Sequence, residues 1–300
     1  MKILLTLDID APHSPERTRS ENLLRLIWDQ LQVTGFPVEY FLKSASTHHL
    51  VSWAREPSSL EKYFRETPSS LQSYDLIISV DLPPGAEALF TSLGIKTMIL
   101  RSVPCAPFGN MVLVRANFQL KDDYLVALPN LKNSYQQNFW GKNKSPGERA
   151  WWLANRFLLN KGRSDASILF LGTSIMQPER KQSGSLVNFA TYHDSILEIL
   201  KASPNFFYSS PLPMDHSELR FMKQLGATCP SLPIAQLLAS DEFDFLVSLD
   251  SAYVPVARAF NKKITILGSQ PTWSTLPVRQ FCRETFLLQL LQEQQLHSSP

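Results

Sequence analysis

Two aspartates directly follow the first apolar run of the chain, in the stretch LDID. The run from Ile3 to Leu7 is broken only by Thr6, which is typical of a strand buried on both faces of a sheet. Asp8 and Asp10 therefore stand where a strand ends. A DxD pair in this place suits a magnesium-dependent phosphatase, with the first carboxylate as nucleophile and the second as acid and base. A plain turn, or one wall of an acceptor site, would use aspartates equally well, so these interpretations stay open.

Serine hydroxyls follow two apolar runs in the second half of the chain. In FDFLVSLDSAYVPVARAF, Ser248, Asp250 and Ser251 stand after an expected strand and before an expected helix. These side chains can cap that helix, or they can join its free N–H groups in holding a phosphate. In FFYSSPLP, Ser209 and Ser210 end an aromatic run before a loop stiffened by prolines. This second loop offers hydroxyls but no obvious catalytic side chain.

A long segment from Gly172 to Asp194 shows no helical or strand periodicity. Loops of this length inside a compact domain are usually functional or mobile. Arg180 can pair with a phosphate, and Glu179 can act as a base or a nucleophile. Because Gly, Ser and charged residues also describe an ordinary solvated loop, that alternative stays open.

Several function classes lack their sequence signals. The chain has no GxGxxG, GxxxxGK[ST], HExxH or GxSxG motif, so a dinucleotide site, a P-loop, a zinc protease site and a nucleophile elbow are not expected. The three cysteines are scattered without a CxxC pair, which predicts no zinc site and a reducing compartment. We expect neither a metal nor a cofactor. A net charge of +2, with 19% charged residues, gives no sign of nucleic-acid binding.

The chain shows no targeting or membrane-spanning segment. The apolar part of MKILLTLDIDAP is too short for a signal peptide and lacks a small-residue cleavage site. No apolar run approaches the ~20 residues of a membrane span. We therefore expect a cytoplasmic protein, and peripheral attachment at the inner face of the membrane stays open.

Strand and helix patterns alternate along both halves of the chain. Apolar runs predict strands at 3–7, 37–42, 75–80, 96–100 and 111–114, and again at 167–172, 206–208, 243–249 and 263–268. Helical patterns stand between many of them, at 86–94, 191–201, 216–225 and 252–260 among others. This alternation predicts the α/β class, with two Rossmann-like domains facing a cleft.

Domain boundaries follow from the break in this alternation. The pattern loosens after residue 114, and Ser145-Pro146 starts a strong helical pattern. We place an N-terminal α/β domain for the acceptor at residues 1–144 and a C-terminal α/β domain for the donor at 145–275. Residues 276–300 are expected to form a long amphipathic helix that can cross back, followed by a tail.

Several segments occur in the order and spacing of a known family. ILFLGTSI, FYSSPLP and LDSAYVPVARAFNKKITILG resemble three donor-side segments of bacterial capsule and lipopolysaccharide glycosyltransferases of the GT-B fold. The similarity is to the Kdo (3-deoxy-manno-octulosonic acid) transferases in particular. In the first half, DLIISVDLPPGAEALF resembles their acceptor-side segment, in which an acidic residue, here Asp81, precedes a pair of prolines. The resemblance covers residues 75–270.

The chain departs from this family at several functional positions. Leu212 stands where the family's HP motif has its phosphate-binding histidine, and Ser210 stands where a lysine precedes it. Val256 takes the place of the carboxylate in the EA motif, and Thr173 takes the place of a glutamine. A leucine cannot donate the charge-assisted hydrogen bond, worth roughly 1.5–3 kcal/mol, that a histidine gives a phosphate. Prolines and apolar strands are therefore retained while the phosphate chemistry is altered.

The resemblance implies transfer of a sugar from a nucleotide sugar, with a CMP-sugar such as CMP-Kdo favoured, to a glycan acceptor in surface-polysaccharide biosynthesis. A non-catalytic GT-B relative that binds a glycan or a partner enzyme is the alternative, and a DxD phosphatase is a minor one. Asp81, Asp10 and Glu179 are the candidate catalytic carboxylates. The candidate substrate-binding residues are Asp8, Ser209, Ser210, Ser248, Asp250, Ser251 and Arg180.

Overall fold

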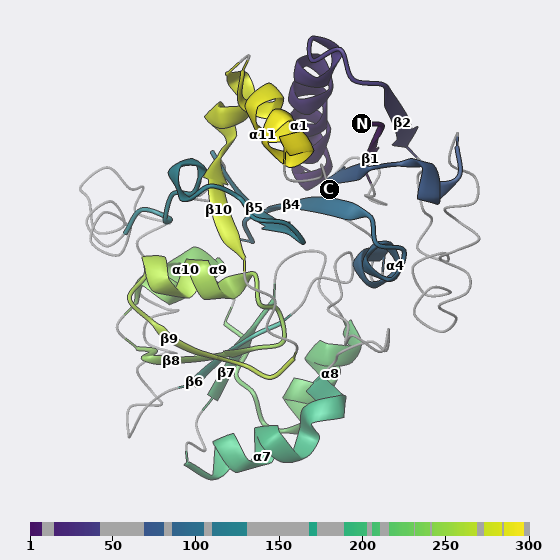
Figure 1. Ribbon diagram of the computed structural model, residues 1–300. Helices are drawn as coiled ribbons and strands as arrows, with labels where there is room; N and C mark the ends of the chain where they lie inside the picture. The colour runs from purple at the N-terminus through teal and green to yellow at the C-terminus, as the bar shows by residue number, and fades with distance from the viewer. Residues whose placement is uncertain are drawn as a thin grey trace.

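The protein contains two mostly parallel sheets (Figure 1). It is seen in a computed structural model. The structure describes residues 1–7, 15–42, 69–80, 86–104, 110–130, 168–172, 189–202, 206–210, 216–230, 232–240, 242–268, 273–283 and 285–296. The helical pattern expected from Ser145-Pro146 onward lies outside these ranges.

The first sheet has six strands in the order β10-β5-β4-β3-β1-β2. Its elements are β1 (Ile3–Leu7), α1 (Pro15–Gln32), β2 (Val38–Leu42), η1 (Leu71–Ser73), β3 (Leu76–Val80), α4 (Ala86–Ser92), β4 (Lys96–Ser102), β5 (Met111–Ala116) and η3 (Asp122–Tyr124). β2, β1, β3 and β4 are parallel to one another. β5 pairs antiparallel with β4, and β10 pairs antiparallel with β5.

The second sheet has four parallel strands in the order β7-β6-β8-β9. Its elements are β6 (Ile168–Leu171), η4 (Phe189–Tyr192), α7 (His193–Ala202), β7 (Phe206–Ser209), α8 (His216–Gln224), α9 (Ile234–Ala239), β8 (Phe245–Ser248), α10 (Tyr253–Ala259) and β9 (Lys263–Ile266).

Both sheets share one strand order. In each, the first strand lies between the second and the third, and the fourth follows the third. This is a doubly wound order with a topological switch point beside its first strand. The predicted α/β class with two Rossmann-like sheets is confirmed. The boundaries at 144/145 and 275/276, and an open cleft between the halves, stay predictions.

The C-terminal segment differs from the long helix expected from Leu276 onward. Ser274–Pro277 instead form β10, which pairs with β5, and Val278–Cys282 form the short helix η5. The helix α11 begins only at Phe286 and ends at Leu296. Pro277 has no N–H to donate, so it suits the end of an edge strand and not a helix interior. The chain does cross back, because α11 packs against α1 and the first sheet.

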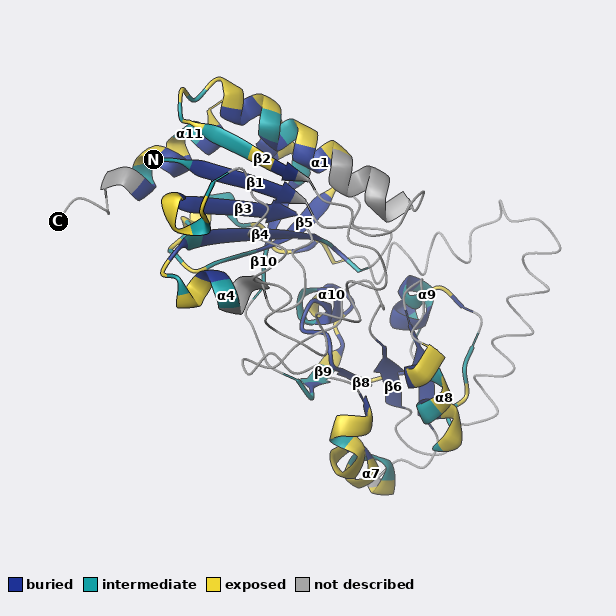
Figure 2. Ribbon diagram, turned by 90° about the vertical axis from the view of Figure 1, so that its right-hand side faces the viewer, coloured by how far each residue is buried: buried dark blue, intermediate teal, exposed yellow. Residues whose placement is uncertain are grey.

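The elements stack in alternating layers (Figures 1 and 2). α1 and α11 cover one face of the first sheet, and their apolar side chains form one core with those of β1, β3, β4 and β5. α4 covers part of the opposite face. α7 and α8 lie beyond the second sheet, where they form its outer core. α9 and α10 lie between the two sheets.

An apolar cluster fills the seam between the halves. From the first half it contains Val103, Met111, Leu113 and Leu128, all of them buried. From the second half it contains side chains of β6, β8, α9 and α10. We call this cluster the seam. Where β5 meets α9 and α10, the two halves are therefore joined by a packed interior.

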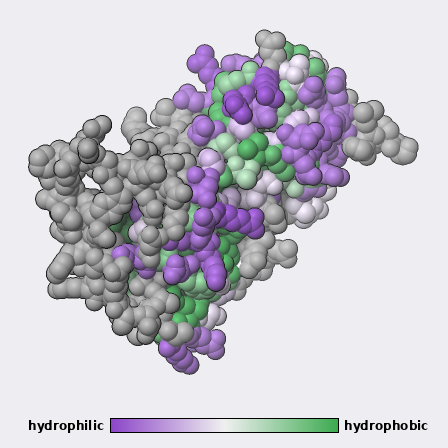
Figure 3. All heavy atoms as spheres, turned by 90° about the vertical axis from the view of Figure 1, so that its left-hand side faces the viewer, coloured by the Kyte–Doolittle hydropathy of each residue, from purple (hydrophilic) through white to green (hydrophobic). Residues whose placement is uncertain are grey.

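The described surface shown in Figure 3 is mainly hydrophilic, with smaller hydrophobic areas between the polar side chains. None of the helices that the structure describes combines the length and the apolar character that a bilayer crossing needs.

Candidate functional site

The carboxyl ends of β6, β7 and β8 meet at one edge of the second sheet. β6 lies between β7 and β8, so the switch point of this sheet falls between β6 and β8. Open α/β sheets bind their ligands at such points. The Gly172 N–H donates to the Ser209 carbonyl at 2.8 Å, and the Ser248 hydroxyl donates to the Leu171 carbonyl at 2.8 Å. The three strand ends are thus tied together.

Gly172 is required by close packing at this edge. A Cβ at this position would lie 2.8 Å from Cζ of Tyr208, whose side chain is buried in the outer core of the second sheet. Carbon atoms do not approach so closely, so only glycine fits without a shift of the ring. The glycine therefore sets the path of the chain as it leaves β6.

Ser248 and Asp250 hold the turn between β8 and α10. The Ser248 hydroxyl accepts from the Asp250 N–H at 3.0 Å, and the Asp250 carboxylate accepts from the Ala252 N–H at 2.9 Å. The next two N–H groups, of Tyr253 and Val254, donate to carbonyls of the turn itself. These four N–H groups are satisfied within the protein. They close the turn with internal hydrogen bonds.

Asp250 is also paired with an arginine of the first sheet. Arg101 lies near the end of β4, and its guanidinium donates to both carboxylate oxygens of Asp250, at 2.9 and 2.6 Å. Only 10% of the Arg101 side chain and 1% of the Asp250 side chain are exposed. A bidentate, desolvated pair of this kind is strong and geometrically specific. The Asp250 carboxylate therefore already neutralises the positive charge of Arg101 at this edge.

Ser251 is engaged by a second residue that the sequence reasoning missed. The indole N–H of Trp273 donates to the Ser251 hydroxyl at 3.1 Å. The Arg115 guanidinium of β5 lies over the same indole ring, 4.4 Å from its centre. A guanidinium over a tryptophan face is a favourable cation–π contact. Ser251 is thereby connected to the first sheet through Trp273.

The predicted substrate-binding residues of the second sheet do lie together, but they are buried. Ser209 and Ser210 are 7% and 9% exposed, and Ser248, Asp250 and Ser251 are 1% exposed or less. Arg101 was not predicted, although a signal was present: it is a charged residue directly after the apolar run TMIL. Arg115 carries the same signal, because it directly follows the apolar run MVLV, whereas Trp273 carries no comparable local signal.

The other predicted residues fall outside the described parts of the chain. These are Asp8, Asp10, Asp81, Glu179 and Arg180, together with Thr173 and Leu212 of the motif comparison. Val256, at the motif's carboxylate position, is described and is fully buried in the seam. Within the described residues, no group of three or more His, Cys, Asp or Glu side chains could hold a metal ion.

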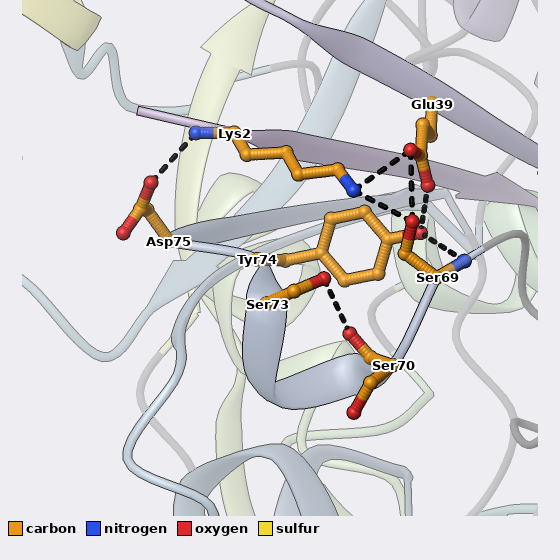
Figure 4. A network of polar contacts seen from close by, with 7 residues as sticks. All are labelled: Lys2, Glu39, Ser69, Ser70, Ser73, Tyr74 and Asp75. Carbon is orange, nitrogen blue, oxygen red and sulfur yellow. Dashed lines mark hydrogen bonds and ion pairs between the residues drawn. The ribbon is translucent and has the colours of Figure 1, made fainter.

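A separate polar cluster lies at the amino ends of β1, β2 and β3 (Figure 4). Lys2 Nζ contacts Glu39 Oε1 at 2.8 Å and donates to the Ser69 hydroxyl at 2.6 Å. The Tyr74 hydroxyl donates to the other Glu39 oxygen. The Lys2 hydrogen bond, followed by that from Tyr74, lowers the pKa of Glu39. Burial, followed by the bond to Glu39, raises the pKa of Tyr74 to about 12. This cluster ties the strand starts together.

Comparison with known proteins adds little to this geometry. No protein-family profile and no curated protein matches the chain. Among solved structures, it is similar to the UDP-GlcNAc 2-epimerase of Methanocaldococcus jannaschii, crystallised in complex with UDP-GlcNAc and UDP. The two chains share 12% identity at a TM-score of 0.32, over 89% of this chain and 84% of the epimerase. A likeness at this level carries no conclusion about chemistry.

Proposed function

We propose that this chain is a glycosyltransferase-like protein of bacterial surface-polysaccharide biosynthesis. It binds a nucleotide sugar, with a CMP-sugar such as CMP-Kdo favoured, at the carboxyl edge of the second sheet and passes the sugar to a glycan acceptor. The observation that supports this proposal is the switch point between β6 and β8, with Ser209 and Ser210 at the end of the neighbouring strand. In this proposal the N-terminal half binds the acceptor at the inner face of the membrane.

The places of the candidate residues along the sheet edge suggest a division of labour. Ser248, Asp250 and Ser251 join the β8–α10 turn to β6 and to Trp273, so we assign them to holding the edge in shape. In this proposal Ser209, Ser210 and Arg180 contact the donor's phosphate, and Asp8 contacts the acceptor. A carboxylate from Asp81, Asp10 or Glu179 would act at the anomeric carbon, as base in an inverting route or nucleophile in a retaining one.

A second candidate function is favoured by Asp250 itself. Its carboxylate already accepts from the Ala252 N–H and from the Arg101 guanidinium, two donors that a phosphate at this edge would otherwise use. Val256, at the place of the motif's carboxylate, is turned into the seam. These two features favour a non-catalytic relative that keeps the fold and binds a glycan or a partner enzyme.

Thermal unfolding in the presence of nucleotides separates the two functions. A ligand that binds only the folded state stabilises it by about 2.7 kcal/mol at 100 times its Kd. CMP, UDP and GDP, and their sugar conjugates, should be added one at a time to the purified chain. A rise in melting temperature with one nucleotide series supports the transferase. No rise with any nucleotide, together with a rise on adding polysaccharide acceptor fragments, supports the non-catalytic relative.

Paired serine variants then test where the nucleotide binds. Ser210→Ala should weaken nucleotide affinity about tenfold or more, because a hydrogen bond to a charged phosphate is worth roughly 1.5–3 kcal/mol. Ser251→Ala should leave affinity unchanged and lower only stability, because its hydroxyl accepts from Trp273. The reverse pattern would move the phosphate to the β8–α10 turn and exclude the division of labour proposed above.

A further inference from the structure

Two arginines of the first sheet reach one turn of the second. β4 and β5 are antiparallel neighbours in which Arg115 lies opposite Ile99. Because alternate residues of a strand share a face, Arg101 lies on the same face of the sheet as Ile99 and Arg115. Arg101 contacts Asp250, and Arg115 contacts the indole that holds Ser251. Two neighbouring strands therefore engage two consecutive residues of the β8–α10 turn.

The first attachment is an ion pair removed from water. Its two N–H···O distances, 2.9 and 2.6 Å, are those of a bidentate pair, and both side chains are at least nine-tenths buried. Loss of one partner would leave the other charge buried and uncompensated, which is far costlier than loss of a surface pair. The pair therefore resists any separation of β4 from the turn.

The second attachment passes through Trp273, which directly precedes β10. Its ring packs against the seam and lies under the Arg115 guanidinium, while its N–H donates to Ser251. β10 itself is hydrogen-bonded to β5. The position of this indole is therefore set by the first sheet, although its hydrogen bond is made to the second.

The two attachments lead directly to the switch point of the second sheet. Asp250 also accepts from the Ala252 N–H at the start of α10, and its own N–H donates to Ser248. Ser248 in turn donates to Leu171 at the end of β6. A displacement of Arg101 or Arg115 would thus move the strand ends where a ligand is proposed to bind.

We infer that Arg101–Asp250 and Arg115–Trp273–Ser251 form a two-point clamp that fixes the orientation of the second sheet relative to the first. The seam lies beside the clamp and supplies apolar contact between the same elements. The clamp makes the two halves one rigid unit, and they do not open and close about a hinge. The inference does not depend on nucleotide binding.

Hydrogen exchange of the full chain, followed by mass spectrometry, tests this clamp. Asp250→Asn keeps side-chain size, Arg101→Lys keeps the positive charge, and each removes the bidentate ion pair. Each should speed amide exchange on both sides of the seam, in residues 111–116 of β5 and 253–259 of α10, by about tenfold or more. Trp273→Phe keeps the ring but removes the indole N–H, and it should give the same two-sided pattern to a smaller degree.

Glu39→Gln is the matched control, because it removes a hydrogen-bonded ion pair at the opposite end of the first sheet. It should speed exchange only near the strand starts and leave both seam segments unchanged. An increase confined to the mutated side of the seam would overturn the clamp, as would no increase at all. If Asp250→Asn does not fold, Trp273→Phe serves as the test alone, since one-sided exchange in that variant would overturn the clamp in the same way.

Discussion

At the scale of single residues, the close packing of Tyr208 leaves no room for a side chain at Gly172. An added methyl group would meet the Tyr208 ring, which is 1% exposed and packed within the outer core of the second sheet. We expect Gly172→Ala to destabilise the protein by about 1–3 kcal/mol, the usual cost of overpacking a core. Chemical denaturation would measure this as a lower midpoint at an unchanged slope.

A double variant provides the control for this prediction. Tyr208→Phe removes the phenolic oxygen, the atom nearest to the added methyl group. The double variant Gly172→Ala/Tyr208→Phe should therefore lose less stability than the sum of the two single losses. Strict additivity would show that the glycine is needed for another reason, because residues in contact are expected to couple.

The Glu39 cluster predicts a dependence of stability on pH. Hydrogen bonds from Lys2 and then Tyr74 hold the pKa of Glu39 below its ordinary 4.5. A lowered pKa in the folded state contributes stability above pH 4.5, and this contribution is lost as the pH falls through the folded pKa. Glu39→Gln should cost about 1 kcal/mol at pH 7 and progressively less toward pH 3. Melting curves of both proteins across this range would show the gap closing.

Tyr74 predicts a loss of stability as the pH rises into the alkaline range, the opposite direction to that of Glu39. Its pKa is raised from 10.0 to about 12, so the folded state holds the phenolic proton more tightly than the unfolded chain does. The resulting stability is present below pH 10 and is lost as the pH rises toward 12. Tyr74→Phe should remove this alkaline loss. An unchanged alkaline melting profile in Tyr74→Phe would show that another group titrates there.

At the scale of elements, α11 is expected to stabilise the first sheet by apolar docking. Leu287 is fully buried in the core shared with α1, whereas Leu288 on the same helix is only partly buried. Leu287→Ala should cost about 2–5 kcal/mol, the range for a buried leucine that leaves a cavity. Leu288→Ala is the matched control and should cost clearly less. If urea unfolding showed equal losses of stability in the two variants, α11 would stabilise the protein through helix propensity and not through packing against the core.

The elements also show where sequence patterns succeed and where they stop. The parallel strands were predictable, because runs such as LIISV and ILFL are apolar at nearly every position and are buried on both faces. The segment from Leu276 was not, because its apolar spacing fits a helix. The pairing of β10 with β5, far away in sequence, overrides that local pattern.

At the scale of the whole molecule, the candidate site was predictable only in part. Ser248, Asp250 and Ser251 were located correctly at a strand end, because strand ends in parallel sheets gather at one edge. Their partners were not predictable, since Arg101 lies 149 residues from Asp250 and no local period connects them. Side chains expected to hold a ligand thus proved to be bonded within the protein, in part across the seam. Partners that are distant in sequence therefore decide whether a polar side chain at a strand end can bind a ligand.

The seam further predicts that the two halves unfold together. A chain of 300 residues with two sheets would ordinarily show separate transitions for its parts. Here one buried cluster contains side chains of both halves, and β10 returns the chain to the first sheet after the second is complete. We expect a single calorimetric transition whose measured enthalpy equals its van't Hoff enthalpy. Leu113→Ala, in the seam, should destabilise the protein by about 2–5 kcal/mol without splitting that transition. Two resolved transitions in the unmodified protein would mean that the halves are joined more weakly than their shared core and the clamp imply.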